Sequence, residues 1–171
     1  MSLARLTYSA RPSALLRCTN GSVFVETLIA VLVPVIFFFS TWQLIDLFTA
    51  QLILKHAAVS AARAAIVVGA DDPRFYDGQA VNDLSKGGPR HRDVERAAAL
   101  VLAAAPNLQT GLRVDIEGNA DGNSPITATV TSDYACHGGW LSLACGGGNY
   151  RRLTAQATLP YQGAKYKYVG K

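Results

Sequence analysis

Residues 20–26, with the sequence Asn-Gly-Ser-Val-Phe-Val-Glu, decide how this chain is organised, because they join a polar leader to a long apolar run. From Ser22 to Ile45 the only ionisable side chain is Glu26. About 20 apolar residues are enough for a helix to cross the hydrocarbon core of a bilayer. A carboxylate inside such a run costs roughly 2.5–3.5 kcal/mol at the helix centre and less near the helix end, where Glu26 lies. The run therefore predicts a membrane-spanning helix with one acid that needs a partner.

The partner of Glu26 depends on how the leader is processed. Cleavage after Gly21 would expose a new α-amino group at Ser22, four residues before the acid. Without that cleavage, Glu26 would be an acid at the membrane edge whose side chain reaches the headgroups. Both alternatives keep the helix in a membrane.

The charge distribution predicts the topology of the chain. It has 171 residues and a formal net charge of +4, but the leader holds three arginines and no acid. Removing the leader leaves 13 basic and 12 acidic residues, so the basic isoelectric point does not argue for nucleic acid as a partner. Basic residues before the span keep the amino terminus in the cytoplasm, so we expect the carboxyl-terminal part to be exported.

Two other export signals compete with a processed anchor. An ordinary secretory signal needs a short apolar core and small residues before the cut, whereas this apolar stretch continues to Leu54. Its first polar break, at residues 48–50, places a bulky Phe where a small residue is required. An uncleaved signal anchor is the second alternative.

The helix is expected to continue well beyond the membrane. Residues 41–68 space their polar side chains three to five apart and carry six alanines between 57 and 65, until residues 69–73 (Gly-Ala-Asp-Asp-Pro) end the helix. Pro34 lies inside the span and should kink it, because proline removes a backbone donor. The alanine-rich face can pack on the chain's own domain, on other subunits, or on both.

The remainder predicts a small α+β domain. We expect residues 70–90 to form a surface loop, with one helical turn near 79–84, and residues 90–105 to form a helix. The period then changes to two, which predicts strands over residues 112–117, 126–131 and 153–159. The predicted fold is a long amino-terminal helix followed by one helix on a roughly three-stranded antiparallel sheet. The expected parts are a leader (1–21), a hydrophobic stem (22–69) and a head domain (70–171).

The cysteines predict one disulfide. Cys18 lies in the leader, which leaves Cys136 and Cys145 in the part expected to be exported. In an oxidising compartment this pair should form a bond. Closing so short a loop contributes about 2–3 kcal/mol by the chain-entropy estimate. The bond would hold a glycine-rich loop that presents Trp140 and Leu141.

No pattern for catalysis or for a cofactor is present. The spacing of Cys136, His137 and Cys145 matches no zinc module, and the pattern does not favour a cysteine nucleophile. The alternating acids and amides of residues 115–123 lack the bidentate glutamate of a calcium loop. His56 and His91 are isolated, and the basic Arg151-Arg152 pair is expected to be solvated rather than bound to lipid or to an acidic partner. We therefore expect a protein that is not an enzyme and holds no metal or cofactor.

Three features together resemble a known family. Gly21 with Glu26 at the fifth position after it resembles the processing site of type IV prepilins. Pro34 within the apolar run and the alanine-rich residues 56–65 are similar to the TadE-type pseudopilins of bacterial tight-adherence (Tad/Flp) pilus systems. Residues 153–161 (LTAQATLPY) add to the likeness.

The resemblance implies a location, partners and residue roles. A prepilin peptidase would cut between Gly21 and Ser22, and Glu26 of an incoming subunit would meet the Ser22 amine of a subunit already assembled. The protein would reside in the bacterial inner membrane with its carboxyl-terminal domain in the periplasm, or outside the cell in a pilus. Its partners would be other pilin and minor pilin subunits and the platform proteins, and its role would be to prime or cap the filament. A non-polymerising membrane-anchored interaction protein and a pseudopilin of a related secretion or contact-dependent apparatus are the alternatives.

Overall fold

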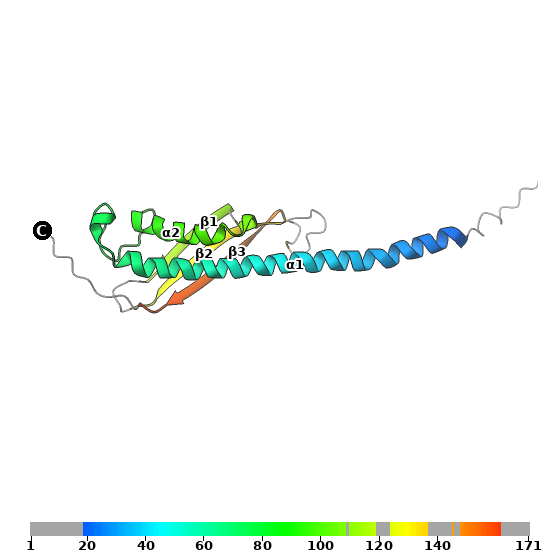
Figure 1. Cartoon of the computed structure of the whole chain (residues 1–171), viewed down its shortest axis with the longest axis horizontal. Coiled ribbons are helices and arrows are strands. Elements are labelled where there is room, and N and C mark those ends of the chain that lie inside the picture. Colours follow the sequence, from blue (N-terminus) through cyan, green and yellow to red (C-terminus); the bar gives the residue numbers. More distant parts are fainter. Residues whose placement is uncertain (1–18, 109, 119–123, 137–144, 146–147, 162–171) are drawn as a thin grey trace, which may run out of the picture. The chain divides into compact units, whose positions relative to one another are not determined.

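A computed structural model describes residues 19–108, 110–118, 124–136, 145 and 148–161. In chain order the elements are α1 (Thr19–Gly69), the 3₁₀ turn η2 (Pro73–Phe75), α2 (Pro89–Leu102), the 3₁₀ turn η3 (Pro106–Leu108), β1 (Thr110–Glu117), β2 (Ile126–Ala135) and β3 (Tyr150–Leu159) (Figure 1). The predicted fold class is confirmed, since a long apolar helix precedes a small domain with a three-stranded antiparallel sheet.

α1 contributes to two compact units of the chain. The first unit comprises residues 1–39 and the second residues 40–171, so the division falls inside the helix. The segment Val23–Gly69 is long and apolar enough to cross a membrane. The helix is continuous across Pro34. The kink expected there stays a prediction.

The second half of α1 belongs to the core of the second unit. Small and apolar side chains three or four residues apart form one buried face: Leu54, Ala57, Ala58, Ala61, Ala62 and Ala65, each fully buried. They share a single core with Val94 and Ala98 of α2 and with one face of the sheet. Of the possibilities left open by the sequence, the structure shows the alanine-rich face packed on the chain's own domain. The alanines allow this close approach because they carry only a methyl group.

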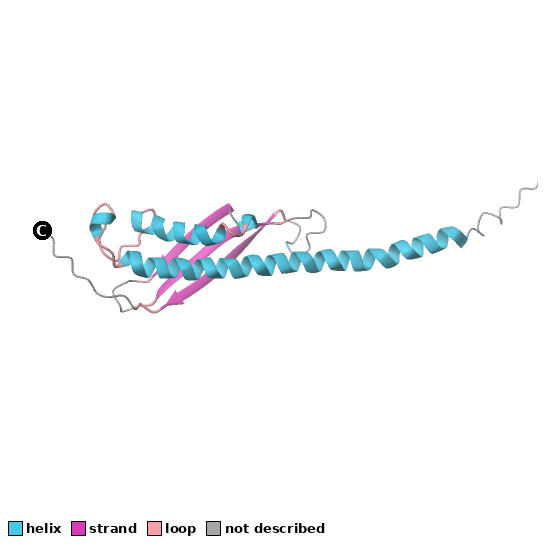
Figure 2. Ribbon diagram, viewed as in Figure 1, coloured by secondary structure: helices cyan, strands magenta, loops and turns pink. Residues whose placement is uncertain are grey.

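The sheet has the order β1-β2-β3, and both pairs are antiparallel (Figure 2). β2 is central and alternates strictly between buried and half-buried side chains. Its buried residues share their core with α1 and α2, so both helices cover the same face of the sheet. The sequence predicted that one helix covers the sheet. In the structure, residues 50–65 of α1 cover the same face together with α2. The opposite face of the sheet is open.

The structure corrects several element boundaries. The helical turn expected at residues 79–84 is wrong, and a 3₁₀ turn forms at Pro73–Phe75 instead, because Asp72 Oδ1 accepts a bond of 2.9 Å from the Arg74 amide. α2 ends at Leu102, three residues earlier than predicted, before Pro106 opens η3. All three strands are longer than their alternating cores suggested.

Candidate functional site

The amino-terminal part of α1 presents an open apolar surface with one acid. Large side chains such as Phe24, Leu28 and Phe37 are 69%, 53% and 73% exposed. Glu26 is also exposed, and none of the ion pairs formed among the described residues includes it. Its neighbour Thr27 turns its hydroxyl back onto the helix and donates a bond of 2.8 Å to the Val23 carbonyl. Within the described part of this surface, Glu26 is thus an exposed acid that takes part in no ion pair.

The predicted processing and assembly residues all fall on this one helix. α1 begins at Thr19, so Gly21 and Ser22 lie in its first turn and Glu26 about one turn further. Pro34 lies two turns beyond the acid. The leader residues 1–18, Cys18 included, lie outside the described residues. Cleavage after Gly21 would thus cut within the first turn of the helix.

The predicted disulfide is confirmed. Cys136 and Cys145 are bonded, with Cα atoms 6.4 Å apart. The bond joins the residue that follows β2 to the segment that leads into β3. The Cys136 amide also donates a bond of 2.9 Å to the Asn149 carbonyl, so the two chain segments are held twice. Trp140 and Leu141 lie outside the described residues.

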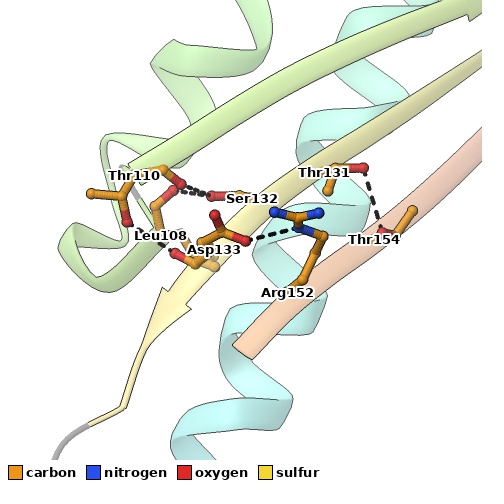
Figure 3. Close-up of polar contacts among 7 residues, drawn as sticks. All are labelled: Leu108, Thr110, Thr131, Ser132, Asp133, Arg152 and Thr154. Atoms are coloured by element: carbon orange, nitrogen blue, oxygen red, sulfur yellow. Dashed lines mark hydrogen bonds and ion pairs between the residues drawn. The ribbon is translucent and has the colours of Figure 1, made fainter. Parts of the chain in front are cut away.

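The open face of the sheet is rich in threonine. Thr127 and Thr158 on neighbouring strands bring their hydroxyls to 2.9 Å. Thr131 and Thr154 bring theirs to 3.4 Å, and Figure 3 shows this second pair. The charged residues of this face lie mostly at its margins. These are Arg113, Asp115 and Glu117 on β1, and Asp133 with its ion-pair partner Arg152 at 3.0 Å.

Ser132 and Gly111 set the corner where β1 begins. Figure 3 shows the Ser132 hydroxyl directed at the carbonyls of Leu108 and Thr110, to which it donates. Between Thr110 and Arg113 the pairing register with β2 shifts. Gly111 sits in this bulge with a φ of +70°, and a Cβ there would lie 2.7 Å from a carboxylate oxygen of Asp133. The left-handed φ therefore favours glycine at this position, and any larger residue would also displace the Asp133 side chain.

Arg90 is the most buried charged residue that the structure describes, and no sequence pattern indicates its role. Its guanidinium donates to the Val68 carbonyl, to the Asp71 carbonyl at 3.0 Å and to the Gln79 carbonyl at 3.3 Å. A positive charge is unfavourable in the first turn of a helix, which is where Arg90 lies in α2. Its guanidinium, however, reaches the carboxyl end of α1, where the carbonyl groups stabilise a cation. Arg90 therefore fastens the end of α1 to the loop before α2.

Tyr76 and His91 complete the polar groups around Arg90. The guanidinium carbon lies 4.3 Å from the centre of the Tyr76 ring, a cation–π distance. Burial and then the nearby Asp71 carboxylate raise the pKa of Tyr76 above its usual 10.0. His91 Nε2 lies 3.1 Å from the Val114 carbonyl and so donates to it. His91 Nδ1 lies 3.4 Å from Glu95 without forming a hydrogen bond, so His91 ties α2 to β1 through one nitrogen.

The described part of the second unit holds no cluster typical of catalysis. A shallow depression between α1 and α2 is lined mainly by Ile53, His56, Arg63 and Val101. Among the described residues, no three His, Cys, Asp or Glu side chains gather as a metal site would require. The described features that can bind are surfaces: the apolar face of α1 and the sheet.

No family model, curated protein or solved structure matches this chain. Its function must therefore be inferred from its own residues and their geometry.

Proposed function

We propose that this chain is a minor pilin or pseudopilin of a tight-adherence, type IV-like pilus system. A prepilin peptidase would cut it between Gly21 and Ser22, and α1 would anchor it in the bacterial inner membrane. The observation that carries the proposal is the single acid Glu26, exposed on an apolar helical surface one turn after that bond.

The chemistry of this pair supports an assembly role. Cleavage converts a neutral peptide bond into an ammonium group at Ser22, four residues before Glu26. A carboxylate is costly in lipid unless a cation accompanies it, and the positive end of a helix adds to its stabilisation. An incoming subunit whose Glu26 meets the Ser22 amine of the preceding subunit would bring both charges into the filament together.

The second unit would then be the part that contacts other proteins. We propose other minor pilins and the platform proteins as its partners, with no nucleic acid, no cofactor and no catalytic activity. Its carboxyl-terminal domain would face the periplasm, since the arginines lie before the span. A disulfide between Cys136 and Cys145 suits that oxidising compartment.

A membrane-anchored interaction protein that never polymerises is the second candidate. The observation that favours it is the burial of the alanine-rich face of α1 within the chain's own domain. That face is no longer available to other subunits, so contacts between subunits would rest on the first unit and on the outer surface of the domain.

Amino-terminal sequencing with intact mass measurement tests the processing step. The full-length chain is expressed in a bacterium that carries a prepilin peptidase and in the same strain without it. We expect a start at Ser22 only in the first strain, and none there for Gly21→Val. A start near Met1 in both strains would contradict the proposal, and a start beyond Ala50 would indicate an ordinary secretory signal.

Glu26→Leu separates assembly from anchoring. We expect this variant to be cut and inserted normally but to remain in the membrane fraction, because its amine partner has no carboxylate to meet. The matched control is Thr27→Leu, which changes the adjacent exposed residue and leaves the charge in place. Equal recovery of both variants in the sheared surface fraction would favour the static anchor.

A further inference from the structure

The exposed aromatic side chains of the second unit lie mostly at one end of it. Among the described residues of this unit there are four, all more than half exposed: Trp42, Phe48, Phe75 and Tyr150. Trp42 and Phe48 lie on α1 shortly after it enters the unit at residue 40, whereas Phe75 lies in η2, beyond the other end of α1. Tyr150 is the first residue of β3, so its position depends on where that strand begins.

Tyr150 lies level with Asp46 of α1, at the end of the unit where α1 enters. The first two residues of β3 pair with the last two residues of β2, one of which is Tyr134. Burial and then the Asp46 carboxylate raise the pKa of Tyr134 above its usual 10.0, so the phenol lies within range of that charge. Figure 1 agrees, because β3 begins at the same end of the unit. Tyr150 therefore shares this end with Trp42 and Phe48.

α1 must leave the hydrocarbon core of the bilayer at this same end. That core is about 30 Å thick, which a helix crosses in about 20 residues at about 1.5 Å each. Counted from Val23, where the apolar span begins, the core ends near Trp42. Gln43 and Asp46 then supply the first polar side chains. The headgroup layer beyond the core is roughly 5–8 Å thick, so it covers about the next four or five residues of α1.

We propose that this end of the second unit lies in the headgroup layer and that Tyr150 binds phospholipid headgroups there. Trp42 would lie at the inner boundary of the same layer. Tyrosine and tryptophan are enriched at membrane–water interfaces, because the ring is apolar and its polar tip can hydrogen-bond to water and headgroups. The inference rests on the membrane anchor proposed above, and it stands whether or not the chain enters a filament.

A tilt of α1 would move Tyr150 only slightly relative to this layer. Packed layers of secondary structure lie roughly 10 Å apart, which puts a side chain on the outer face of the sheet about 10–15 Å from the axis of α1. Transmembrane helices tilt by about 20° on average, which would raise or lower that side chain by about 3–5 Å. This shift is no larger than the thickness of the headgroup layer, so the contact does not depend on one tilt angle.

Tryptophan fluorescence of the full-length chain in lipid vesicles tests the contact. The vesicles contain phosphatidylcholine and phosphatidylglycerol, with part of the lipid carrying a nitroxide quencher on its headgroup. Trp42→Phe and Trp140→Phe together remove both native tryptophans, and either Tyr150→Trp or Phe75→Trp is added to that background. Both additions replace one exposed aromatic side chain with another, so Phe75→Trp is the matched control.

We expect the headgroup nitroxide to quench the tryptophan at position 150 several-fold more strongly than the one at position 75. The control residue follows the end of α1 at Gly69, which is about 35 Å along the helix from Asp46. Equal quenching at the two positions would overturn the inference, because it would mean that neither end of the unit is specifically in contact with lipid.

A chain that carries only Trp140→Phe keeps Trp42 and reports on the anchor itself. Quenching of Trp42 without quenching at position 150 would overturn the inference and leave the proposed anchor intact. The absence of quenching at both positions would overturn the anchor as well. Urea midpoints of all variants guard against misfolding. Should Tyr150→Trp fail to fold, Asn149→Trp at the adjacent exposed residue decides the result, because the Asn149 carbonyl that accepts from Cys136 is unchanged.

Discussion

Replacing Arg90 with alanine should be among the most destabilising single changes in this domain. The side chain is fully buried, and its guanidinium is the donor for three main-chain carbonyls at the end of α1 and in the loop that follows. Alanine would leave the carbonyls of Val68, Asp71 and Gln79 without this donor. It would also remove the cation from the face of the Tyr76 ring.

The size of the effect follows from opposing contributions. Three hydrogen bonds from a charged donor are worth about 1.5–3 kcal/mol each, or roughly 5–9 kcal/mol together. The variant no longer has to bury a guanidinium, which recovers several kcal/mol. We therefore expect the free energy of unfolding to fall by about 3 kcal/mol, with lysine at position 90 intermediate because it lacks the planar fork of donors.

Urea unfolding of the full-length chain in non-ionic detergent measures this change. Near-ultraviolet circular dichroism monitors the unfolding. Arg96→Ala is the matched control, since Arg96 lies on the same helix with its side chain 75% exposed and paired with Asp93. Exposed pairs of this kind contribute about 0–1 kcal/mol. If Arg90→Ala and Arg96→Ala unfold at the same urea concentration, the reasoning about the buried guanidinium is refuted.

Three further outcomes are expected. Leu54→Ala should lower the unfolding free energy by about 3–5 kcal/mol, because it opens a cavity under a fully buried side chain. Leu100→Ala, at a side chain 77% exposed, should change it by less than about 0.5 kcal/mol; equal urea midpoints for these two variants would contradict the burial of α1. The raised pKa of Tyr76 means that the folded state favours the neutral phenol, so its contribution is complete below pH 10.0 and is lost as the pH rises through the raised pKa. A pH series of melts on wild type and Tyr76→Phe should show that alkaline loss reduced in the variant, and identical series would refute it. Reducing the Cys136–Cys145 bond should cost about 2–3 kcal/mol in the same urea assay, and an unchanged midpoint would show that the loop is held without it.

The sheet could be predicted from the sequence because its signal is local. In β2, Thr127, Thr129 and Thr131 alternate with apolar residues, and this pattern alone gives the strand and the side that faces the core. The pairing of Cys136 with Cys145 was equally accessible, because only two cysteines follow the leader. These features depend on neighbouring residues and on simple counting.

The features that were missed depend on distant partners. Arg90 stands in a run of basic and acidic residues typical of a solvated helix start, and its three acceptors are main-chain carbonyls, which carry no sequence signal. The alanine-rich face of α1 has the same sequence pattern whether it packs on the chain's own domain or on another subunit. The end of α2 at Leu102 was missed because alanine at 103–105 has high helix propensity, which Pro106 overrides by restricting the residue before it.

The burial of α1 against the sheet imposes an order of events on the newly made chain. Leu54 is synthesised roughly 100 residues before Leu153, which shares its core. At about 5–20 residues per second, the apolar face of α1 stays uncovered for roughly 5–20 s. Contacts of such long sequence separation also form slowly. A chaperone that holds the chain during this interval, or a membrane surface against which α1 can lie, would determine how much of the protein folds rather than aggregates.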